Sequence, residues 1–285
     1  MINENSILVV VVLYKCRIDE SDSIKTLAAS IHHGAWNCID LMIYDNSPEY
    51  NDSNIYNDPT FRIHYVPDKN NSGVSRAYNI GADLGQRMKK EYILLLDQDT
   101  EVSLSYCSEL SKMKSKYPLI VPKLICRGLI ISPCRYKWGR GTYLNVEDCV
   151  RGINSLKNRN FLNSGSLISI SLFKRVGGFD ENIPLYFSDF NFFNRLKRIH
   201  STFFLLESTF HHNMASNDES NMKQFVKRFE MYCDGAYRCY KSNLGISLMV
   251  LNVLLRAFKL AIKYQTFYFI QIALRRFFAF INSKI

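Results

Sequence analysis

Two carboxylates follow directly on an apolar run in the stretch "EYILLLDQDTEV", residues 91–102. Tyr92 to Leu96 are apolar or aromatic, which is typical of a buried strand, and Asp97 and Asp99 come at its end. Paired negative charges at that position are unfavourable unless a cation compensates them, and carboxylate oxygens suit Mg²⁺ or Mn²⁺. Such an ion would also neutralise the charge that builds up on a leaving phosphate. The alternative is a turn carrying two solvated acids.

The elements that would position these acids alternate between strands and helices. The pattern predicts strands at 7–13, 41–47, 61–67, 92–97, 119–122 and 202–208, and helices at 22–33, 72–90 and 103–116. We therefore expect an α/β fold with a mostly parallel, Rossmann-like sheet flanked by helices. Ligands bind such sheets beyond the carboxyl ends of the strands, which is where Tyr14, Asp45 and Asp97 lie.

Composition limits the class of protein. The chain has 285 residues, of which 47% are hydrophobic, enough for one large domain or one domain with an appendage. Its net charge of +10 is concentrated in residues 235–285, which hold eight Lys or Arg and no Asp or Glu. The eight cysteines show no zinc-binding spacing, and the N-terminus resembles no signal peptide. We therefore expect reduced, cytosolic thiols.

Three other classes of function fit the sequence less well. A nucleic-acid-binding module would explain the positive charge, but the basic residues are mixed with aliphatic ones and no recognised motif is present. A nicotinamide-dependent Rossmann enzyme needs a glycine-rich fingerprint after its first strand, and "LYKCRIDES" has no glycine. A nucleotidyltransferase would show a glycine-rich, basic signature there, so it stays a more distant alternative.

The C-terminal stretch from Leu248 to Ile281 has helical apolar periodicity broken by basic residues. One apolar face would comprise Leu251, Leu254, Leu255, Phe258 and Ile262, and a second Ile270, Ala273, Leu274, Phe277, Phe278 and Ile281. The interrupting residues are Arg256, Lys259, Lys263, Arg275 and Arg276, too many for an ordinary membrane span. Basic amphipathic helices lie in the lipid interface, so we expect membrane association. Packing on the catalytic domain or a second subunit is the alternative.

Six motifs in order, over roughly residues 7–215, resemble those of family 2 glycosyltransferases with the GT-A fold. They are "VVVVLYK", "YDNS", "NNSGVSRAYNIGA", "LLLDQDT", "NSGSLISISLFKRVGGFDE" and "YFSDFNFFNRLK". Within that family the chain is most similar to bacterial rhamnosyltransferase-like enzymes of O-antigen, lipopolysaccharide and other surface-polysaccharide synthesis. The resemblance implies a GT-A catalytic domain at 1–220 and leaves a helical, membrane-associating region at 221–285.

The resemblance also implies roles for individual residues. The nucleotide-sugar donor would contact Tyr14, Asp45, Gly73, Arg76 and Asp97. Asp97, Asp99 and His212 would hold Mg²⁺ or Mn²⁺, and Ser164 and Gly165 would line the acceptor side. Asp189 would be the general base of an inverting transfer. Ser188 stands where the family often has an acid, and Ala215 where it more often has glycine.

These residues have physical interpretations of their own. The aromatic residues around Asp189 would desolvate it and raise its pKa, although it could instead cap a helix. Asp45 could form an Asx-turn in "DNSP". Gly73 opens a predicted helix whose N-terminus could face an anion, with Arg76 adding charge, although Arg76 could be an ordinary surface residue. Strand alternation would place His211 opposite His212, which leaves His211 as the second candidate.

The sequence therefore predicts an inverting, metal-dependent glycosyltransferase. The expected donor is dTDP-rhamnose because of "DQDT", with a UDP-hexose or UDP-N-acetylhexosamine as the alternative. By resemblance, the acceptor would be a glycan linked to undecaprenyl diphosphate. The enzyme would then work at the membrane surface, on the cytoplasmic face of the bacterial inner membrane.

Overall fold

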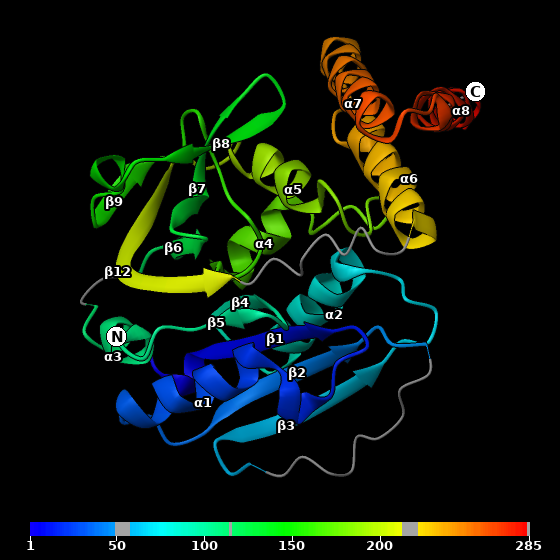
Figure 1. Ribbon diagram of the computed structural model, residues 1–285. Helices are drawn as coiled ribbons and strands as arrows, with labels where there is room; N and C mark the ends of the chain where they lie inside the picture. The colour runs from blue at the N-terminus through cyan, green and yellow to red at the C-terminus, as the bar shows by residue number, and fades with distance from the viewer. Residues whose placement is uncertain (49–57, 114–115, 213–221, 284–285) are drawn as a thin grey trace.

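The computed structural model describes residues 1–48, 58–113, 116–212 and 222–283 (Figure 1). Its strands form one mixed sheet in the order β10-β7-β6-β11-β4-β1-β2-β3, and β12 pairs with β5, β6 and β9. The longer strands are β1 (Ile7–Leu13), β2 (Ile39–Asp45), β3 (Phe61–Pro67), β4 (Tyr92–Asp97), β6 (Leu119–Cys126), β7 (Leu129–Lys137), β8 (Arg140–Leu144) and β12 (Thr202–His212). The shorter strands are β5 (Thr100–Glu101), β9 (Gly152–Ser155), β10 (Arg159–Asn160) and β11 (Leu167–Ser169).

Eight α-helices accompany this sheet in the described part of the chain. They are α1 (Asp22–His33), α2 (Val74–Arg87), α3 (Tyr106–Ser111), α4 (Ile170–Val176), α5 (Ser188–Leu196), α6 (Met222–Arg238), α7 (Asn243–Tyr264) and α8 (Tyr268–Asn282). In Figure 1, α6, α7 and α8 gather on the side of α5, away from β1, β2 and β3.

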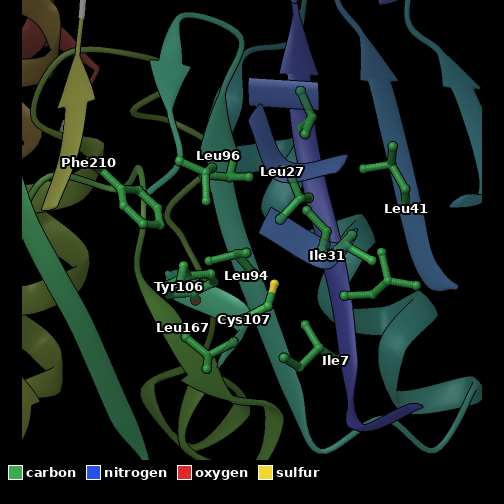
Figure 2. Close-up of a cluster of buried hydrophobic side chains, with 14 of the residues drawn as sticks. Ile7, Leu27, Ile31, Leu41, Leu94, Leu96, Tyr106, Cys107, Leu167 and Phe210 are labelled. Carbon is green, nitrogen blue, oxygen red and sulfur yellow. The ribbon is translucent and has the colours of Figure 1, made fainter. Parts of the chain in front are cut away.

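The central strand β1 is buried on both faces, as its unbroken apolar run predicts. Val9 and Val11 face one hydrophobic core, and Val10 and Val12 face the other. Helices α1 and α3 cover the first core, and α2, α4 and α5 cover the second. Figure 2 shows Leu27 of α1 packed with α3 side chains and β4 leucines in the first core.

The sheet register brings the ends of three strands to one edge. β1 runs parallel to β2 and to β4, with Leu13 opposite Asp45 and Val12 opposite Asp97. Because these pairs close their strands, Tyr14, Asp45 and Asp97 lie at the same carboxyl edge, as the sequence predicts. The mostly parallel arrangement of the N-terminal half is therefore confirmed.

Several predicted boundaries need correction. The strand expected at 41–47 is Ile39–Asp45, and the one expected at 119–122 extends over Leu119–Cys126. The helix expected at 103–116 covers only Tyr106–Ser111, and the one at 72–90 covers Val74–Arg87. The β7–β8 hairpin and the short strands β9 and β10 were not predicted, because prolines, glycines and cysteines obscure the period of two.

The C-terminal helices form a third hydrophobic cluster. Phe229 and Tyr237 of α6, Met249 of α7 and Phe269 of α8 are among its buried residues. On α8, Arg275 and Arg276 make ion pairs with Glu230 and Asp234 of α6. The inner faces therefore pack as a helical unit, which agrees with the packing alternative for part of the tail.

Helix α7 is the one described helix with the length and apolar composition of a membrane span. Its mean hydropathy reaches 1.8, and 44% of that stretch is buried within the protein. The sequence argument against a span concerned Leu248 to Ile281, and α7 begins five residues earlier, at Asn243.

Helix α2 approaches the sheet closely through a glycine. A Cβ added at Gly81 would lie 2.5 Å from Val10 Cγ2 and 3.3 Å from Ile93 Cδ1. These contacts explain why a helix position carries glycine despite its low helix propensity. The absent side chain lets α2 lie flat on β1.

We predict that Gly81→Val lowers the free energy of unfolding by about 1–3 kcal/mol, because overpacking forces side chains and backbone apart. Chemical denaturation of both proteins measures this change. The matched control is Gln86→Val, which places the same side chain on the exposed face of α2 and should shift stability by about 0.5 kcal/mol or less. Equal effects of the two variants would contradict the close packing at Gly81.

Candidate active site

The turn after β4 is held from three directions. Tyr78 of α2, which is fully buried, donates from its hydroxyl to Asp97 Oδ1 at 3.0 Å. Ser164 accepts a hydrogen bond from the Asp97 backbone N–H at 3.0 Å. Ser23 of α1 donates to the carbonyls of Asp97 and Thr100. The two-acid motif is therefore part of a fixed turn whose supports come from distant segments.

Strand β12 delivers His212 to this turn. His212 pairs with Thr100 in the antiparallel ladder between β12 and β5. Its Nδ1 lies 2.9 Å from Thr100 Oγ1 and 3.5 Å from Asp99 Oδ1. His211 pairs with Glu101 and is exposed, so the geometry favours His212 over His211. The segment after His212, including Ala215, lies outside the described residues.

The charges of this cluster influence one another. Burial raises the pKa of Asp97, the electrostatic interaction with His212 opposes that rise, and the negative charge of Asp99 adds to it. A buried carboxylate with a second carboxylate beside it is a site where a cation is stabilised. The structure thus places Asp99 3.5 Å from His212, with Asp97 close enough to interact electrostatically with both, and their role as metal ligands stays a prediction.

Asp189 lies in the first turn of α5 and is not its N-cap, so the capping alternative is wrong. The N-cap is Phe187, in the left-handed region with φ 67°. Burial raises the pKa of Asp189 to about 7. The Phe190 N–H donates a hydrogen bond to Asp189 Oδ1 at 2.6 Å, which lowers this pKa, and the negative charge of Asp97 raises it. A carboxyl group that titrates near neutrality beside a second acid is suited to proton transfer.

The predicted nucleotide residues sit at the ends of β1 and β2. The Tyr14 N–H donates to Gln98 Oε1 at 2.7 Å, which ties the end of β1 to the two-acid motif. The buried Asp45 carboxylate accepts hydrogen bonds from the Ser47 N–H at 2.9 Å and the Tyr65 hydroxyl at 2.7 Å. Asp45 therefore forms the Asx-turn named as its alternative, and a contact with a base stays a prediction.

The start of α2 differs from expectation. Gly73 has φ +91° and is its N-cap, and a Cβ there would lie 2.3 Å from the Pro184 carbonyl oxygen. The Val74 N–H, the first of the helix, donates to that oxygen at 2.8 Å, so this amide does not face an anion. Arg76 makes an exposed pair with Glu181 at 3.4 Å, as an ordinary surface arginine would.

The acceptor-side residues lie against the turn after β4. Ser164 Oγ is 2.7 Å from Thr100 Oγ1, and the Gly165 N–H donates to the Leu95 carbonyl at 2.8 Å. Gly165 has φ +86°, and a Cβ there would lie 2.8 Å from Pro122 Cγ. Only glycine meets both constraints, so this loop is fixed next to Asp97.

Sequence reasoning missed four residues that support this cluster. Asn163 donates to Ser188 Oγ at 3.4 Å, and its buried Oδ1 has no hydrogen-bond partner among the described residues. Tyr78 and Thr100 stand inside quoted motifs, "NNSGVSRAYNIGA" and "LLLDQDT", so their position was a usable signal. No sequence signal identifies Ser23, because the Asp97 carbonyl that it binds is 74 residues away in the chain.

The donor set suits a hard divalent cation bound together with phosphates. The described residues contain no group of three His, Cys, Asp or Glu with metal-ligand geometry. Mg²⁺ is usually bound by one or two carboxylates, with water and substrate phosphates completing its shell. Asp99 and His212, with Asp97 behind them, fit this incomplete type of site.

A cavity of about 580 Å³ opens elsewhere, at the edge where β4 begins. Its lining includes Lys90, Glu91 and Lys174, and none of the predicted site residues. Because Lys90 and Lys174 are already paired with Asp40 and Asp83, the lining offers no free charge cluster. This cavity gives no support to the candidate site, which rests on the geometry at the carboxyl edge.

No family model and no curated protein matches the chain. Solved structures do. TarS 1-349 of S. aureus has a TM-score of 0.54 and 13% identity, over 96% of this chain and 72% of that one. The mannosyltransferase PcManGT of Pyrobaculum calidifontis, in complex with GDP-Man and Mn²⁺, has a TM-score of 0.53 and 10% identity, over 95% and 87%. The chain shares the fold of these two proteins.

A further TarS 1-349 structure, in complex with UDP-GlcNAc, has a TM-score of 0.50 and 12% identity, over 86% of this chain and 69% of that one. At these identities the comparison shows the fold alone. The fold class predicted from the sequence, a mostly parallel sheet flanked by helices with a C-terminal helical tail, is confirmed.

The raised pKa of Asp189 has a consequence for stability. Between about pH 4 and 7 the folded protein keeps this proton and the unfolded chain has lost it, so the free energy of unfolding falls as pH rises. We predict that Asp189→Asn removes this fall and makes the variant more stable than the parent above pH 7. Thermal melts across that range measure it. The exposed Glu147→Gln serves as control, and identical profiles for Asp189→Asn and the parent would contradict the buried carboxyl.

Proposed function

We propose that this protein is an inverting, metal-dependent glycosyltransferase that uses a nucleotide-sugar donor. The observation that carries the proposal is the gathering of Asp97, Asp99, His212 and Asp189 at the carboxyl edge of β4. Proteins of the same fold have been solved with UDP-GlcNAc, or with GDP-Man and Mn²⁺. The charge pattern and the fold support the same chemistry.

Asp189 is the proposed general base. Its pKa near 7 lets it accept the proton of an acceptor hydroxyl as that oxygen attacks the anomeric carbon. The new carbon–oxygen bond forms as the bond from the anomeric carbon to the diphosphate breaks, and the nucleoside diphosphate leaves with the bonding pair. Direct displacement of this kind inverts the anomeric centre.

Asp99 and His212 would hold the divalent ion, with Asp97 completing the negative field behind them. The bound ion would supply positive charge to the leaving diphosphate. Thr100 fixes the imidazole through Nδ1, and Ser164 and Tyr78 hold Asp97. These supports keep the acids in place before a substrate arrives, so little reorganisation accompanies the reaction.

The proposed donor is dTDP-rhamnose, on the resemblance of "DQDT" to rhamnosyltransferase-like motifs. The glutamine of this motif has a structural role, since it accepts the Tyr14 N–H. A UDP-hexose or UDP-N-acetylhexosamine is the second candidate, favoured by the likeness to TarS solved with UDP-GlcNAc. Tyr14, Asp45 and Asp97 remain the proposed donor contacts, whereas Gly73 is covered by the Pro184 carbonyl and Arg76 is paired with Glu181.

The proposed acceptor is a glycan carried on undecaprenyl diphosphate, in O-antigen or other surface-polysaccharide synthesis. The protein would then act peripherally, on the cytoplasmic face of the inner membrane. The exposed apolar residues and basic residues of α7 support this location. Under this proposal residues 1–220 are the catalytic domain and 221–285 the membrane-associating region.

The test of the function is a panel of nucleotide sugars, dTDP-rhamnose, UDP-hexoses, UDP-N-acetylhexosamines and GDP-mannose, assayed for transfer to lipid-linked glycans. We predict turnover with one donor. Asp189→Asn should lower the rate of that turnover by about 10²–10⁴-fold, because the general base is lost. Release of nucleoside diphosphate is measured. Unchanged turnover in Asp189→Asn would reject this residue as the base. Formation of a nucleotide sugar and pyrophosphate from a nucleoside triphosphate and a sugar 1-phosphate would instead identify a nucleotidyltransferase.

We predict that Asp99→Asn loses the stimulation of turnover by Mn²⁺ or Mg²⁺ and binds Mn²⁺ more weakly in the presence of nucleoside diphosphate. Removing one carboxylate lowers the charge that attracts the ion. Titration calorimetry and metal-dependent kinetics measure both effects. Glu101→Gln, a neighbouring carboxylate change, is the matched control. Full metal-stimulated activity in Asp99→Asn would exclude the metal role of this residue.

A further inference from the structure

The two tryptophans of the chain differ sharply in environment. Trp36 is 7% exposed and belongs to the first hydrophobic core, whereas Trp138 is 72% exposed. Trp138 lies in the turn between β7 and β8, and Lys137 Nζ lies 4.7 Å from the centroid of its ring. A large indole held in water is unfavourable, so its position calls for a partner surface.

The turn that carries Trp138 is fixed against α7. Asn252 of α7 donates to the Trp138 carbonyl at 3.0 Å, and Arg140 Nε donates to Asn252 Oδ1 at 2.6 Å. Gly139 fits closely, because a Cβ there would lie 2.7 Å from Met249 Sδ. The turn of the hairpin is therefore held in a fixed position next to α7.

The outer side of α7 is apolar along its length. Five of its residues are between 49 and 84% exposed, namely Leu244, Leu251, Leu255, Phe258 and Ile262. Their spacing of seven, four, three and four residues places them on one stripe of the helix. Leu255 and Arg256 follow Asn252 by three and four residues, so the stripe continues from the hairpin contact.

Basic residues border this stripe. Arg256, Lys259 and Lys263 each follow an apolar stripe residue by one position and are exposed. On the hairpin, Lys137 and Arg140 are exposed as well. No acidic residue occurs after Asp234 in the whole chain. The two arginines of α8, in contrast, make ion pairs with α6 carboxylates.

Packing connects this surface to the helix that carries Asp189. The Arg256 guanidinium lies 4.1 Å from the centroid of the Tyr232 ring, and Tyr232 contacts Phe187 at 5.0 Å between centroids. A Cβ on Gly235 of α6 would lie 2.1 Å from the Tyr186 carbonyl oxygen. The surface therefore lies on the side of the molecule where α5 begins (Figure 1).

We propose that Trp138 and the outer stripe of α7, here the docking surface, bind an anionic lipid membrane, with the indole inserted at the headgroup level. Aromatic residues and apolar helix faces insert at this depth, and basic residues pair with anionic headgroups. A second copy of the chain is a poor occupant, because a symmetric contact would oppose the same positive charges. This inference rests on the proposed function for its purpose, which is to bring a lipid-linked acceptor to Asp189.

Intrinsic fluorescence tests the proposal on the full chain. On addition of vesicles of phosphatidylglycerol and phosphatidylcholine, we expect the Trp138 emission to shift to the blue, and no shift with phosphatidylcholine alone. Trp36→Phe should keep the shift and Trp138→Phe should lose it. In co-sedimentation, Trp138→Ala should weaken vesicle binding by about tenfold, the loss of one inserted aromatic side chain. Lys259→Glu should weaken it too, while the exposed Lys157→Glu, on the β9–β10 turn, should not.

Two results would overturn the docking surface. One is an unchanged Trp138 emission and no co-sedimentation with anionic vesicles. The other is a blue shift that depends on protein concentration without lipid, which would identify a second copy as the occupant. Vesicle binding needs no turnover, so failure of the donor panel leaves this test intact. Conversely, Trp138→Ala should keep transfer to a short-chain, water-soluble acceptor analogue, which separates docking from catalysis.

Discussion

The partly buried carboxylate of Asp97, at the end of a strand whose other residues are buried, is the constraint on which the site depends. A carboxylate in this position raises the free energy of the folded state unless hydrogen bonds and positive charge compensate it. Tyr78 supplies one hydrogen bond, Ser164 fixes the backbone, and the interaction with His212 lowers the pKa of the carboxyl group. Each support comes from a different segment, so parts of the chain that are far apart in sequence meet at this one carboxylate.

The same constraint extends to the base and to the tail. The charge of Asp97 contributes to the raised pKa of Asp189, so loss of either acid alters the protonation of the other. Asp189 in turn lies on α5, where Asn191 donates to the carbonyl of Cys239, the residue that follows α6, at 3.0 Å. The C-terminal helices therefore belong to the support of the base, and they are more than an anchor attached to a finished enzyme.

The sequence predicts well what depends on short-range patterns. The uninterrupted apolar run of 7–13 has one stable outcome, a strand buried on both faces, and the acids at 97 and 99 must then lie at its neighbour's end. Contacts between distant segments are beyond such patterns. The Val74 N–H meets the Pro184 carbonyl, and Arg76 meets Glu181, because a loop more than 100 residues away covers the start of α2. No spacing within "NNSGVSRAYNIGA" contains that information.

Periodicity also leaves open which face of a helix is buried. Both α7 and α8 have apolar stripes with basic residues between them, so their sequence patterns do not distinguish the two helices. In the structure the two helices differ, because Glu230 and Asp234 of α6 form ion pairs with the basic residues of α8. The basic residues of α7 are exposed. The hairpin turn at Trp138 then selects the α7 side through Asn252. The location of the basic surface is thus determined by tertiary contacts of Glu230, Asp234 and Asn252. An amphipathic pattern in the sequence does not identify these contacts.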